Sequence, residues 1–311
     1  MTSAPTPRNL RAELDTLTTE AFRPELAEID QLPTLDIARL MNGEDASVPA
    51  AVASRLPEIA AAIDAVAERM ARGGRLVYAG AGTAGRLGVL DASECPPTFN
   101  TDPTEVVGLI AGGPEAKVTS IEGAEDSKDL ARTDLDALVL TPDDTVVGIS
   151  ASGRTPYAVG AVEHARRHGA LTIGLSCNPG SALAAAAEHG IEVVVGPELL
   201  TGSTRLKAGT AQKLVLNMLS TITMIRLGKT YGNLMVDVRA SNEKLRARSR
   251  RIVALATGAT DPDIERALTE AGGEVKTAIL ILLADTDGPT ATRLLTDSDG
   301  HLRAALKSAG E

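Results

Sequence analysis

The sequence contains few of the residues on which several classes of protein depend. Of its 311 residues 2% are aromatic, with no tryptophan, and two are cysteines, Cys95 and Cys177. So few aromatic rings offer little for nucleic-acid bases to stack on, and two cysteines do not form a disulfide framework. Basic residues are outnumbered, with 31 Lys and Arg against 41 Asp and Glu and a net charge of −10. This balance argues against a protein that binds nucleic acid through a basic face.

Long apolar runs are also missing. The most apolar stretch, residues 214–225, is interrupted by Asn217 and by threonines, and it is shorter than the ~18 residues of a membrane span. The N-terminus lacks the apolar core of a signal peptide, so we expect a cytoplasmic protein without a membrane segment. His164 and His168 are four residues apart, but no glutamate directly follows the first as in a zinc protease, so we expect no metal.

Hydrophobic residues make up 43% of the chain, which is enough for a sizeable core. Short apolar runs alternate with helical patterns, as in an α/β protein with an open sheet. Most of the runs are continuous, which is typical of parallel strands buried on both faces. We therefore predict a doubly wound parallel five-stranded sheet, with strands at 76–79, 106–110, 146–149, 171–175 and 191–195. The spacing of apolar residues predicts helices at 51–72, 124–138, 157–168 and 181–189.

The sequence divides into four regions. Residues 1–54 are polar and broken by prolines, which predicts an N-terminal arm with one or two short helices, and residues 55–230 contain the sheet. A connecting helix is predicted within 231–257, and 258–311 is expected to be a small helical subdomain punctuated by glycines. The last helices are expected at 207–227, 234–257, 262–271, 275–284, 289–295 and 302–307.

A glycine-rich loop follows the first predicted strand. Gly80, Gly82 and Gly85 have the spacing G-x-G-x-x-G, which is a weak dinucleotide signal on its own. A dinucleotide fold also needs an acidic residue at the end of the second strand, to hold the ribose hydroxyls. That strand ends in residues 111–113, Ala-Gly-Gly, and Glu105 lies at its other end. The missing acid argues against NAD.

A loop rich in hydroxyl groups follows the third predicted strand. It contains Ser150, Ser152 and Thr155, and Gly153 and Arg154 repeat the Gly-Arg pair of the first loop. Helix N-termini bind anions, and the carboxyl edge of a parallel sheet forms a ligand crevice. Two such loops favour a phosphorylated ligand. The alternative is that the hydroxyls are ordinary helix N-caps.

Longer strings carry a family resemblance. The loop SASGRT resembles the sugar-phosphate loop of sugar isomerase (SIS) domains, and the chain from about residue 10 to 305 resembles the N-acetylmuramic acid 6-phosphate etherase family. The resemblance rests on GAGTAGRLGVLDASECPPTF (80–99), IEGAED (121–126), ISASGRTPY (149–157), SCNPGS (176–181), GSTRLKAGTAQKLVLNMLSTITM (202–224) and GNLMVDV (232–238).

The resemblance implies a reaction and a site. The family removes D-lactate from N-acetylmuramic acid 6-phosphate by elimination and hydration, needs no metal or redox cofactor, and is expected to form homodimers. Glu94 in SECPP and Glu125 in EGAED match its two catalytic glutamates. The first is expected to protonate the leaving lactate oxygen, and the second to act on the C2 proton or the attacking water. Sugar-phosphate contacts are expected from Thr83, Gly85, Arg86, Ser150, Ser152, Gly153, Arg154, Thr155, Ser203 and Lys207.

Other interpretations stay open at this stage. Glu94 and Glu125 could be surface or helix-end carboxylates, and Lys207 a solvated lysine at a helix start. Glu198 is a reserve candidate, because an aldose–ketose isomerase would use a base near that position, and a non-catalytic sugar-phosphate sensor is a further alternative. One departure concerns affinity. Ala84 replaces the usual serine of the first loop, and a lost hydrogen bond to a charged group costs roughly 1.5–3 kcal/mol.

Overall fold

The structure is a computed structural model that describes residues 12, 14–119, 121–238 and 243–310. The chain divides into two compact units, which are described separately. Unit 1 comprises Met1–Ala92 and Val106–Leu219, and unit 2 comprises Ser93–Glu105 and Ser220–Glu311. Within the described ranges, none of the helices has both the length and the apolar content that crossing a bilayer requires.

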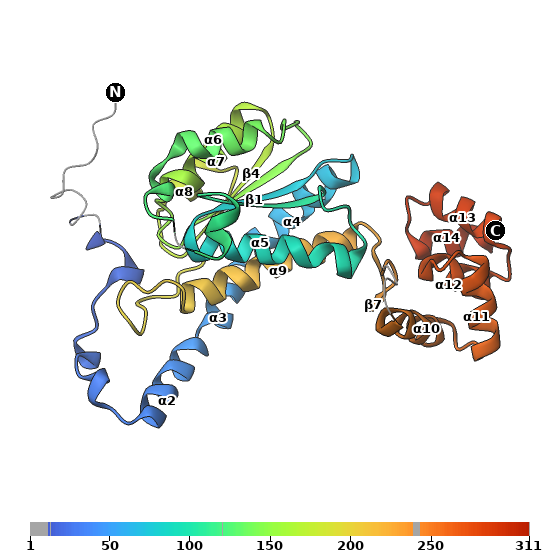
Figure 1. Cartoon of the computed structure of the whole chain (residues 1–311), viewed down its shortest axis with the longest axis horizontal. Coiled ribbons are helices and arrows are strands. Elements are labelled where there is room, and N and C mark those ends of the chain that lie inside the picture. Colours follow the sequence, from blue (N-terminus) through green and yellow to red (C-terminus); the bar gives the residue numbers. More distant parts are fainter. Residues whose placement is uncertain (1–11, 13, 120, 239–242, 311) are drawn as a thin grey trace. The chain divides into compact units, whose positions relative to one another are not determined.

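Unit 1 is built on a five-stranded sheet in which all neighbouring strands are parallel (Figure 1). The spatial order is β2-β1-β3-β4-β5. The chain therefore leaves β1 towards β2 and returns on its other side as β3, and parallel sheets bind ligands at the carboxyl edge of such a switch point. The predicted doubly wound fold is confirmed. The strands are β1 (Leu76–Gly80), β2 (Val106–Ile110), β3 (Thr145–Ile149), β4 (Leu171–Ser176) and β5 (His189–Glu192).

The last strand differs from its prediction at 191–195. β5 pairs with β4 from Ile173 opposite His189 to Ser176 opposite Glu192, and the ladder ends there because β4 ends. Only the N–H of Val193 still donates to Ser176 O, at 2.9 Å. The helix predicted over 181–189 is correspondingly short, because α8 covers Ala182–Ala186.

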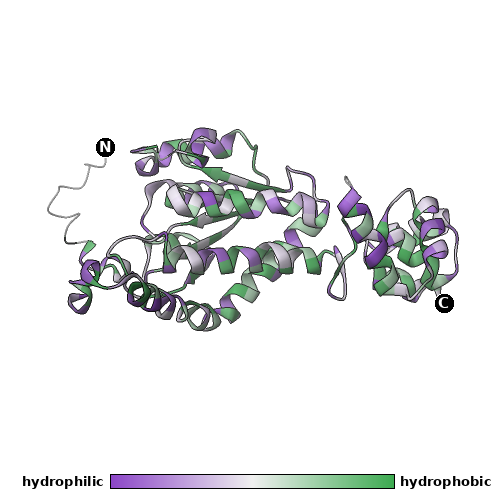
Figure 2. Cartoon of the chain, turned by 60° about the horizontal axis from the view of Figure 1, so that its bottom comes forward, coloured by the Kyte–Doolittle hydropathy of each residue, from purple (hydrophilic) through white to green (hydrophobic). Residues whose placement is uncertain are grey.

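Helices cover both faces of the sheet. Strand side chains alternate between the faces, so Val77 and Ala79 pack in one cluster with α6 (Lys128–Asp136) and α7 (Pro156–Arg167). Tyr78 points to the other face and donates its hydroxyl to Asp91 of α5 (Gly82–Phe99), at 2.8 Å. In Figure 2 the strands are coloured mainly as hydrophobic, and helices around them carry hydrophobic residues along one side and hydrophilic residues along the other. The helix α9 (Lys207–Arg226) was predicted to within one residue.

The region before the sheet contains more elements than the one or two short helices predicted for the arm. After η1 (Thr18–Glu20), η2 (Pro24–Leu26) and η3 (Ile29–Gln31) come α2 (Thr34–Asp45), α3 (Val48–Ala53) and α4 (Leu56–Ala71). The single helix predicted over 51–72 is wrong, because two helices occupy that range. Pro57 lacks the N–H that would continue α3, and in one continuous helix its ring would clash with the carbonyl of Ala53, so α3 ends at Ala53 and α4 begins at Leu56.

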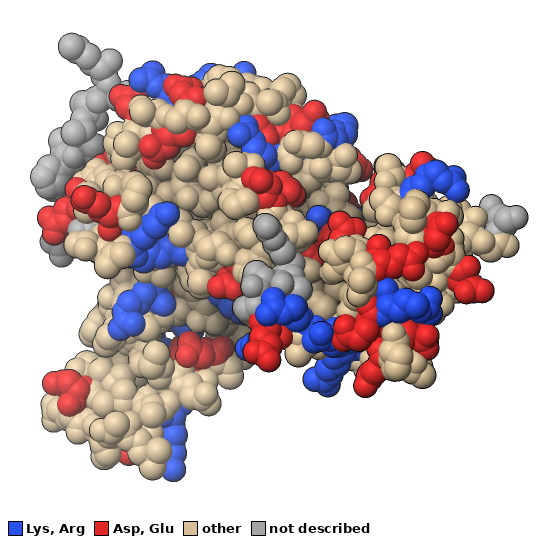
Figure 3. Space-filling view, turned by 45° about the vertical axis from the view of Figure 1, so that its right-hand side comes forward, with Lys and Arg blue, Asp and Glu red and all other residues tan. Residues whose placement is uncertain are grey.

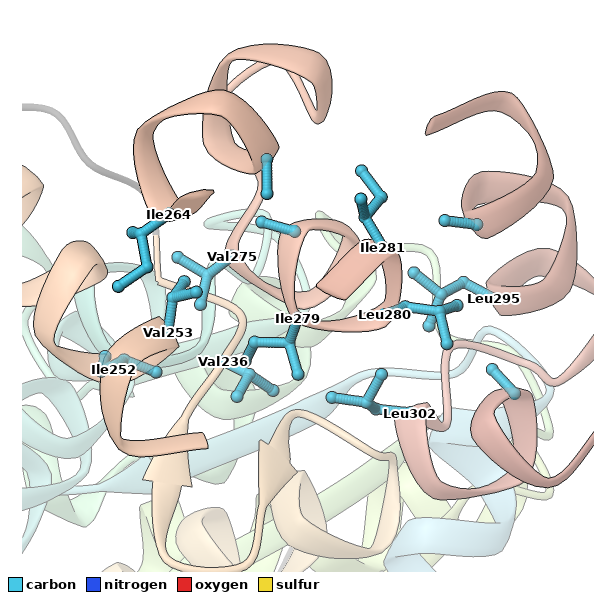
Figure 4. Close-up of a cluster of buried hydrophobic side chains, with 14 of the residues drawn as sticks. Val236, Ile252, Val253, Ile264, Val275, Ile279, Leu280, Ile281, Leu295 and Leu302 are labelled. Atoms are coloured by element: carbon cyan, nitrogen blue, oxygen red, sulfur yellow. The ribbon is translucent and has the colours of Figure 1, made fainter. Parts of the chain in front are cut away.

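Unit 2 contains a helical core of its own. Its helices are α10 (Glu243–Thr257), α11 (Asp261–Glu270), α12 (Val275–Ala284), α13 (Gly288–Asp297) and α14 (Leu302–Ala309). Figure 4 shows aliphatic side chains from these helices meeting in one cluster around α12, with Ile279 and Leu280 fully buried. Such an aliphatic core is what a sequence with so few aromatic residues requires.

The connecting helix predicted within 231–257 is wrong in its first part. β6 (Thr230–Tyr231) and β7 (Leu234–Met235) pair as an antiparallel hairpin, and α10 begins only at Glu243. Residues 239–242 of this prediction, and residues 1–11 and 13 of the arm, lie outside the described residues. The boundaries of the four predicted regions stay a prediction.

Candidate active site

The first glycine loop joins β1 to α5 with two close backbone contacts. A Cβ on Gly85 would lie 2.6 Å from Gly80 O, and one on Gly80 would lie 2.9 Å from Gly85 N, so both contacts require glycine. Gly82 has a φ of +54°, which suits glycine at the turn into the helix. The first turn of α5 is therefore held against the end of β1, with its backbone N–H groups at the carboxyl edge of the sheet.

The second loop, after β3, holds its hydroxyl groups together. Ser150 is buried, and its Oγ lies 2.8 Å from Thr155 Oγ1 and 3.2 Å from Ser152 Oγ. The N–H of Gly153 donates to Ser150 Oγ at 3.0 Å. Thr155 precedes α7 and makes no side-chain capping bond to it. The alternative interpretation of this threonine as an ordinary N-cap is therefore wrong, and its hydroxyl belongs to the loop.

The start of α9 lies against the same edge. A Cβ on Gly209 would be 3.6 Å from Thr83 Cγ2, so the first turns of α9 and α5 are neighbours. Lys207 is 5% exposed at its side chain, and its Nζ donates to Glu44 of α2 at 2.6 Å. The interpretation of Lys207 as a solvated lysine is therefore wrong. Ser203 lies in the preceding turn and is half-buried.

Two carboxylates organise the start of α9. Both oxygens of the fully buried Glu198 accept backbone N–H groups, from Lys207 and Ala208, each at 2.9 Å. Burial raises the pKa of Glu198 despite these donors. Burial also acts to raise the pKa of Glu44, but hydrogen bonds from Lys207 and Arg23 outweigh it and hold that pKa below its ordinary value.

Glu125 lines a small cavity at the ends of β1 and β2. The cavity has a volume of about 180 Å³, and Gly82, Arg86 and Glu122 line it as well. Glu125 is exposed in the short helix η5 (Ala124–Asp126), and Arg86 Nε donates to Lys117 O at 3.3 Å. One of the predicted catalytic carboxylates is thus in the same cavity as a predicted phosphate-binding residue, together with a second glutamate.

Glu94, the other predicted catalytic carboxylate, lies on α5 and outside this cavity. It is exposed in the part of the helix that belongs to unit 2, and it is not among the residues lining the cavity of Glu125. It stands twelve positions after Gly82 in the sequence of α5. The helix continues through Pro96 and Pro97 to Phe99.

Some buried polar residues at this edge were not predicted as functional. The side chain of Asn178, in the string SCNPGS after β4, makes five hydrogen bonds to described residues, and Thr19 of the arm is fully buried beside it. In the sequence, the only sign that these two residues are buried in the fold is that each is polar and has apolar residues nearby in the chain. Cys177 Sγ contacts Ala208 O at 3.7 Å, and burial raises its pKa to about 12, so the thiol stays protonated and is not a nucleophile.

Two other clusters lie away from this edge. A cavity of about 450 Å³ in unit 2 includes Asp237 and Lys276 in its lining, but none of the predicted site residues. In unit 1, ligand atoms of Asp136, His164 and His168 lie within 4.8 Å of one another. The ring of His164 is already engaged, with Nε2 2.8 Å from Asp136 Oδ1 and Nδ1 3.4 Å from a guanidinium nitrogen of Arg167. This group ties α6 to α7.

Comparisons with known proteins agree with the geometry. The family model for the glucokinase regulatory protein N-terminal SIS domain matches residues 58–166, and the SIS domain model matches residues 127–222. A phosphoheptose isomerase from Francisella tularensis superposes with a TM-score of 0.51 at 20% identity, over 62% of this chain and 100% of that one. At this identity the likeness concerns the fold alone.

Curated relatives match nearly the whole chain. An N-acetylmuramic acid 6-phosphate etherase from Streptomyces coelicolor is 85% identical over 309 residues, 99% of both chains. One from Rubrobacter xylanophilus is 61% identical over 293 residues, which is 94% of this chain and 97% of that one. The parallel sheet and the matching family models define a SIS-domain protein. Within that class, the chain belongs to the N-acetylmuramic acid 6-phosphate etherase family.

Proposed function

We propose that this chain cleaves the D-lactyl ether of N-acetylmuramic acid 6-phosphate to give N-acetylglucosamine 6-phosphate and D-lactate, as a carbon–oxygen lyase in the recycling of cell-wall sugars. The observation that carries the proposal is 85% identity to a curated etherase over 99% of both chains. The carboxyl edge of the sheet is in keeping with it, since two loops rich in N–H and hydroxyl donors suit a phosphorylated ligand.

The reaction has two stages, an elimination and a hydration. In the open-chain sugar the aldehyde acidifies the C2 proton. A base removes that proton while the C3–O bond breaks, and an acid protonates the departing lactate oxygen, which leaves a double bond between C2 and C3. Water then adds its hydroxyl to C3 and a proton returns to C2. The net change is hydrolysis of the ether, and one carboxyl group can act as acid in one stage and base in the other.

Phosphate binding falls to the two loops. Ser152 and Thr155 are half-buried hydroxyl donors at the start of α7, and Thr83 and Gly85 lie in the first turn of α5. Arg86 lines the cavity of Glu125 and is proposed to supply positive charge there. Ser150, Gly153, Arg154, Ser203 and Lys207 complete the proposed set, with Lys207 and Ser150 acting from buried positions.

Glu94 is the proposed acid for the lactate oxygen, and Glu125 the proposed group at C2 or at the attacking water. Glu125 lines a cavity of unit 1, whereas Glu94 belongs to the part of α5 in unit 2. The family resemblance implies a homodimer, and in this proposal the second copy supplies its Glu94 to the site.

Two alternatives are not favoured. A sugar-phosphate isomerase would use Glu198 as its base, but both oxygens of that carboxylate accept backbone N–H groups at the start of α9. A sensor without catalysis has no need of Glu94 and Glu125, which both stand in strings that resemble the etherases.

A cytoplasmic location remains part of the proposal. On the face in Figure 3, acidic and basic side chains are interspersed, which does not suggest a nucleic-acid surface.

The proposal is tested by incubating the protein with N-acetylmuramic acid 6-phosphate and measuring D-lactate. We expect release by the natural protein, and a fall in kcat of at least about 100-fold in Glu94→Gln, because a positioned proton-transfer group contributes 10²–10⁴-fold. Glu68→Gln is the matched control, since Glu68 is an exposed glutamate on α4.

Other results would contradict the proposed activity or the role of Glu94. Absence of lactate from the natural protein overturns the lyase, with binding alone pointing to a sensor and a ketose product to an isomerase. If Glu94→Gln releases lactate at the natural rate, the role assigned to Glu94 is wrong.

A further inference from the structure

A short segment of the N-terminal arm, Thr16–Glu20, lies within unit 1 at the carboxyl edge of the sheet. Leu17 is 6% exposed and Thr19 is fully buried, although the segment forms only the short helix η1. A region that the sequence predicts as a polar arm is thus partly enclosed. Burial of a threonine is favourable only if its polar groups have partners, so the partners of Thr19 show what the segment packs against.

Asn178 is the main partner of this segment. Its Oδ1 accepts from the N–H of Thr18 at 2.7 Å and from Thr18 Oγ1 at 2.9 Å, with Thr19 N–H at 3.4 Å. Its Nδ2 donates to Thr19 Oγ1 at 3.0 Å and to Ala151 O at 2.9 Å. The side chain of Asn178 is 1% exposed. One buried amide therefore joins the segment to a residue inside the hydroxyl loop 150–155.

Two further bonds connect the segment to loops of the site. Arg154 Nη2 donates to Thr16 Oγ1 at 3.1 Å, and Gly202 N–H donates to Thr19 O at 3.3 Å. A Cβ on Gly202, which has a φ of +76°, would lie 2.6 Å from a carboxylate oxygen of Glu20. The segment thus spans from the hydroxyl loop to the turn that precedes α9.

From these contacts we infer that Thr16–Glu20 forms a wall of the sugar-phosphate site, and that Asn178 is the positioning residue that holds this wall and the loop 150–155 in place for the phosphate. The inference rests on the proposed function, because it takes that loop to be the anchor of a phosphate monoester. A loop that is ordered before the ligand arrives loses less entropy on binding. Donors that are fixed in advance also interact more strongly with an anion.

The test compares two isosteric exchanges. Asn178→Asp keeps an acceptor for Thr18 but replaces the donor to Ala151 O by an oxygen. We expect the Kd for N-acetylglucosamine 6-phosphate and the KM for the substrate to rise about tenfold or more, with kcat changed less. The matched control is Asp144→Asn, because Asp144 is 1% exposed and pairs with Arg75 at the opposite edge of the sheet. It is expected to lower the Tm and leave the Kd unchanged.

A second variant and a second measurement cover the case in which Asn178→Asp does not fold. Thr19→Val keeps the shape of the buried side chain and removes its hydroxyl, and it is expected to raise the Kd as well. In the natural protein, added N-acetylglucosamine 6-phosphate is expected to slow hydrogen exchange of a peptide covering Thr16–Glu20. A purely structural role of Asn178 would lower the Tm without either effect.

The outcomes separate this inference from the proposed function. Unchanged Kd in folded Asn178→Asp or Thr19→Val, or hydrogen exchange that is indifferent to the ligand, overturns the wall. A weakening in Asp144→Asn equal to that in Asn178→Asp also overturns it, since loss of stability would then explain both. A natural protein that binds the sugar phosphate but releases no D-lactate overturns only the lyase, and one that binds no sugar phosphate overturns both.

Discussion

Ala84 is the residue at which this chain departs from the family pattern in the first loop. It is 7% exposed in the first turn of α5, between Thr83 and the tightly packed Gly85. A serine there would add a hydroxyl donor to a turn whose N–H groups already face the carboxyl edge of the sheet. A serine at position 84 is therefore expected to change the affinity for a phosphorylated ligand while the backbone of the turn stays the same.

Ala84→Ser is expected to tighten binding of N-acetylglucosamine 6-phosphate about tenfold to a hundredfold. A hydrogen bond to a charged group is worth roughly 1.5–3 kcal/mol, and each 1.4 kcal/mol is tenfold in Kd. Titration calorimetry measures the effect. Ala67→Ser, at a buried position of α4, is the control and should leave the Kd unchanged. An unaltered Kd in Ala84→Ser would mean that Thr83 or backbone N–H groups already supply the missing donor.

At the scale of helices and strands, buried polar pairs hold the elements of unit 1 in register. Asp91 of α5 accepts from Tyr78 OH of β1 at 2.8 Å and from Asn217 Nδ2 of α9 at 2.6 Å. Glu44 of α2 accepts from Lys207 of α9, and from Arg23 at 2.6 Å. Hydrophobic packing is non-directional, so such pairs are what fixes how one helix is placed along another.

Glu44→Gln is expected to lower the free energy of unfolding by about 1–3 kcal/mol at neutral pH, because it removes the carboxylate with which the buried Lys207 forms an ion pair. The folded pKa of Glu44 lies below its ordinary value of 4.5. Its contribution is therefore complete above that value and disappears as the pH falls through the folded pKa. Urea unfolding of both proteins between pH 3 and about 7 should show curves that converge in acid.

Glu58→Gln is the control for this prediction. Glu58 pairs with Arg55 at the surface, where both side chains are about two-fifths exposed, and exposed pairs contribute little. No measurable change is expected. A difference between Glu44→Gln and the natural protein that stays constant down to pH 3 would contradict the pairing of Glu44 with Lys207.

At the scale of the whole molecule, we propose that a complete site combines two copies of the chain. Glu125 lines a cavity with Arg86 in unit 1, whereas Glu94 belongs to the part of α5 in unit 2. In a symmetric dimer each copy gives and receives the same contact. A site built from Glu125 of one copy and Glu94 of the other would then occur twice.

Mixing two inactive variants tests this arrangement. Glu94→Gln and Glu125→Gln are each expected to lack activity. After denaturation and joint refolding in equal amounts, about half of the dimers contain one chain of each kind. Each mixed dimer then has one intact site, so about a quarter of the natural D-lactate release should return. No recovery in a mixture that is shown to contain mixed dimers would place both glutamates of a site on one chain.

The sheet and most helices follow from the sequence because their signals are local. Continuous apolar runs predict β1 to β4 to within one residue, and the 3.6-residue period predicts α9 and α12 equally well. Predictions failed where a boundary depends on a distant partner. β5 ends where β4 ends, and the hairpin of β6 and β7 replaces the start of a predicted helix because two short segments pair with each other.

The candidate site likewise has a part that the sequence predicts and a part that depends on the tertiary structure. Glycine spacing and hydroxyl-rich turns locate the two proposed phosphate loops in the sequence, because backbone geometry and helix ends depend on neighbouring residues. Family membership likewise comes from strings of adjacent residues. The partners of Lys207, the capping role of Glu198 and the meeting of Asn178 with Thr19 depend on the folding of residues that lie up to 163 positions apart. No local pattern encodes such contacts, since a buried polar group takes whichever partner the packing brings within reach.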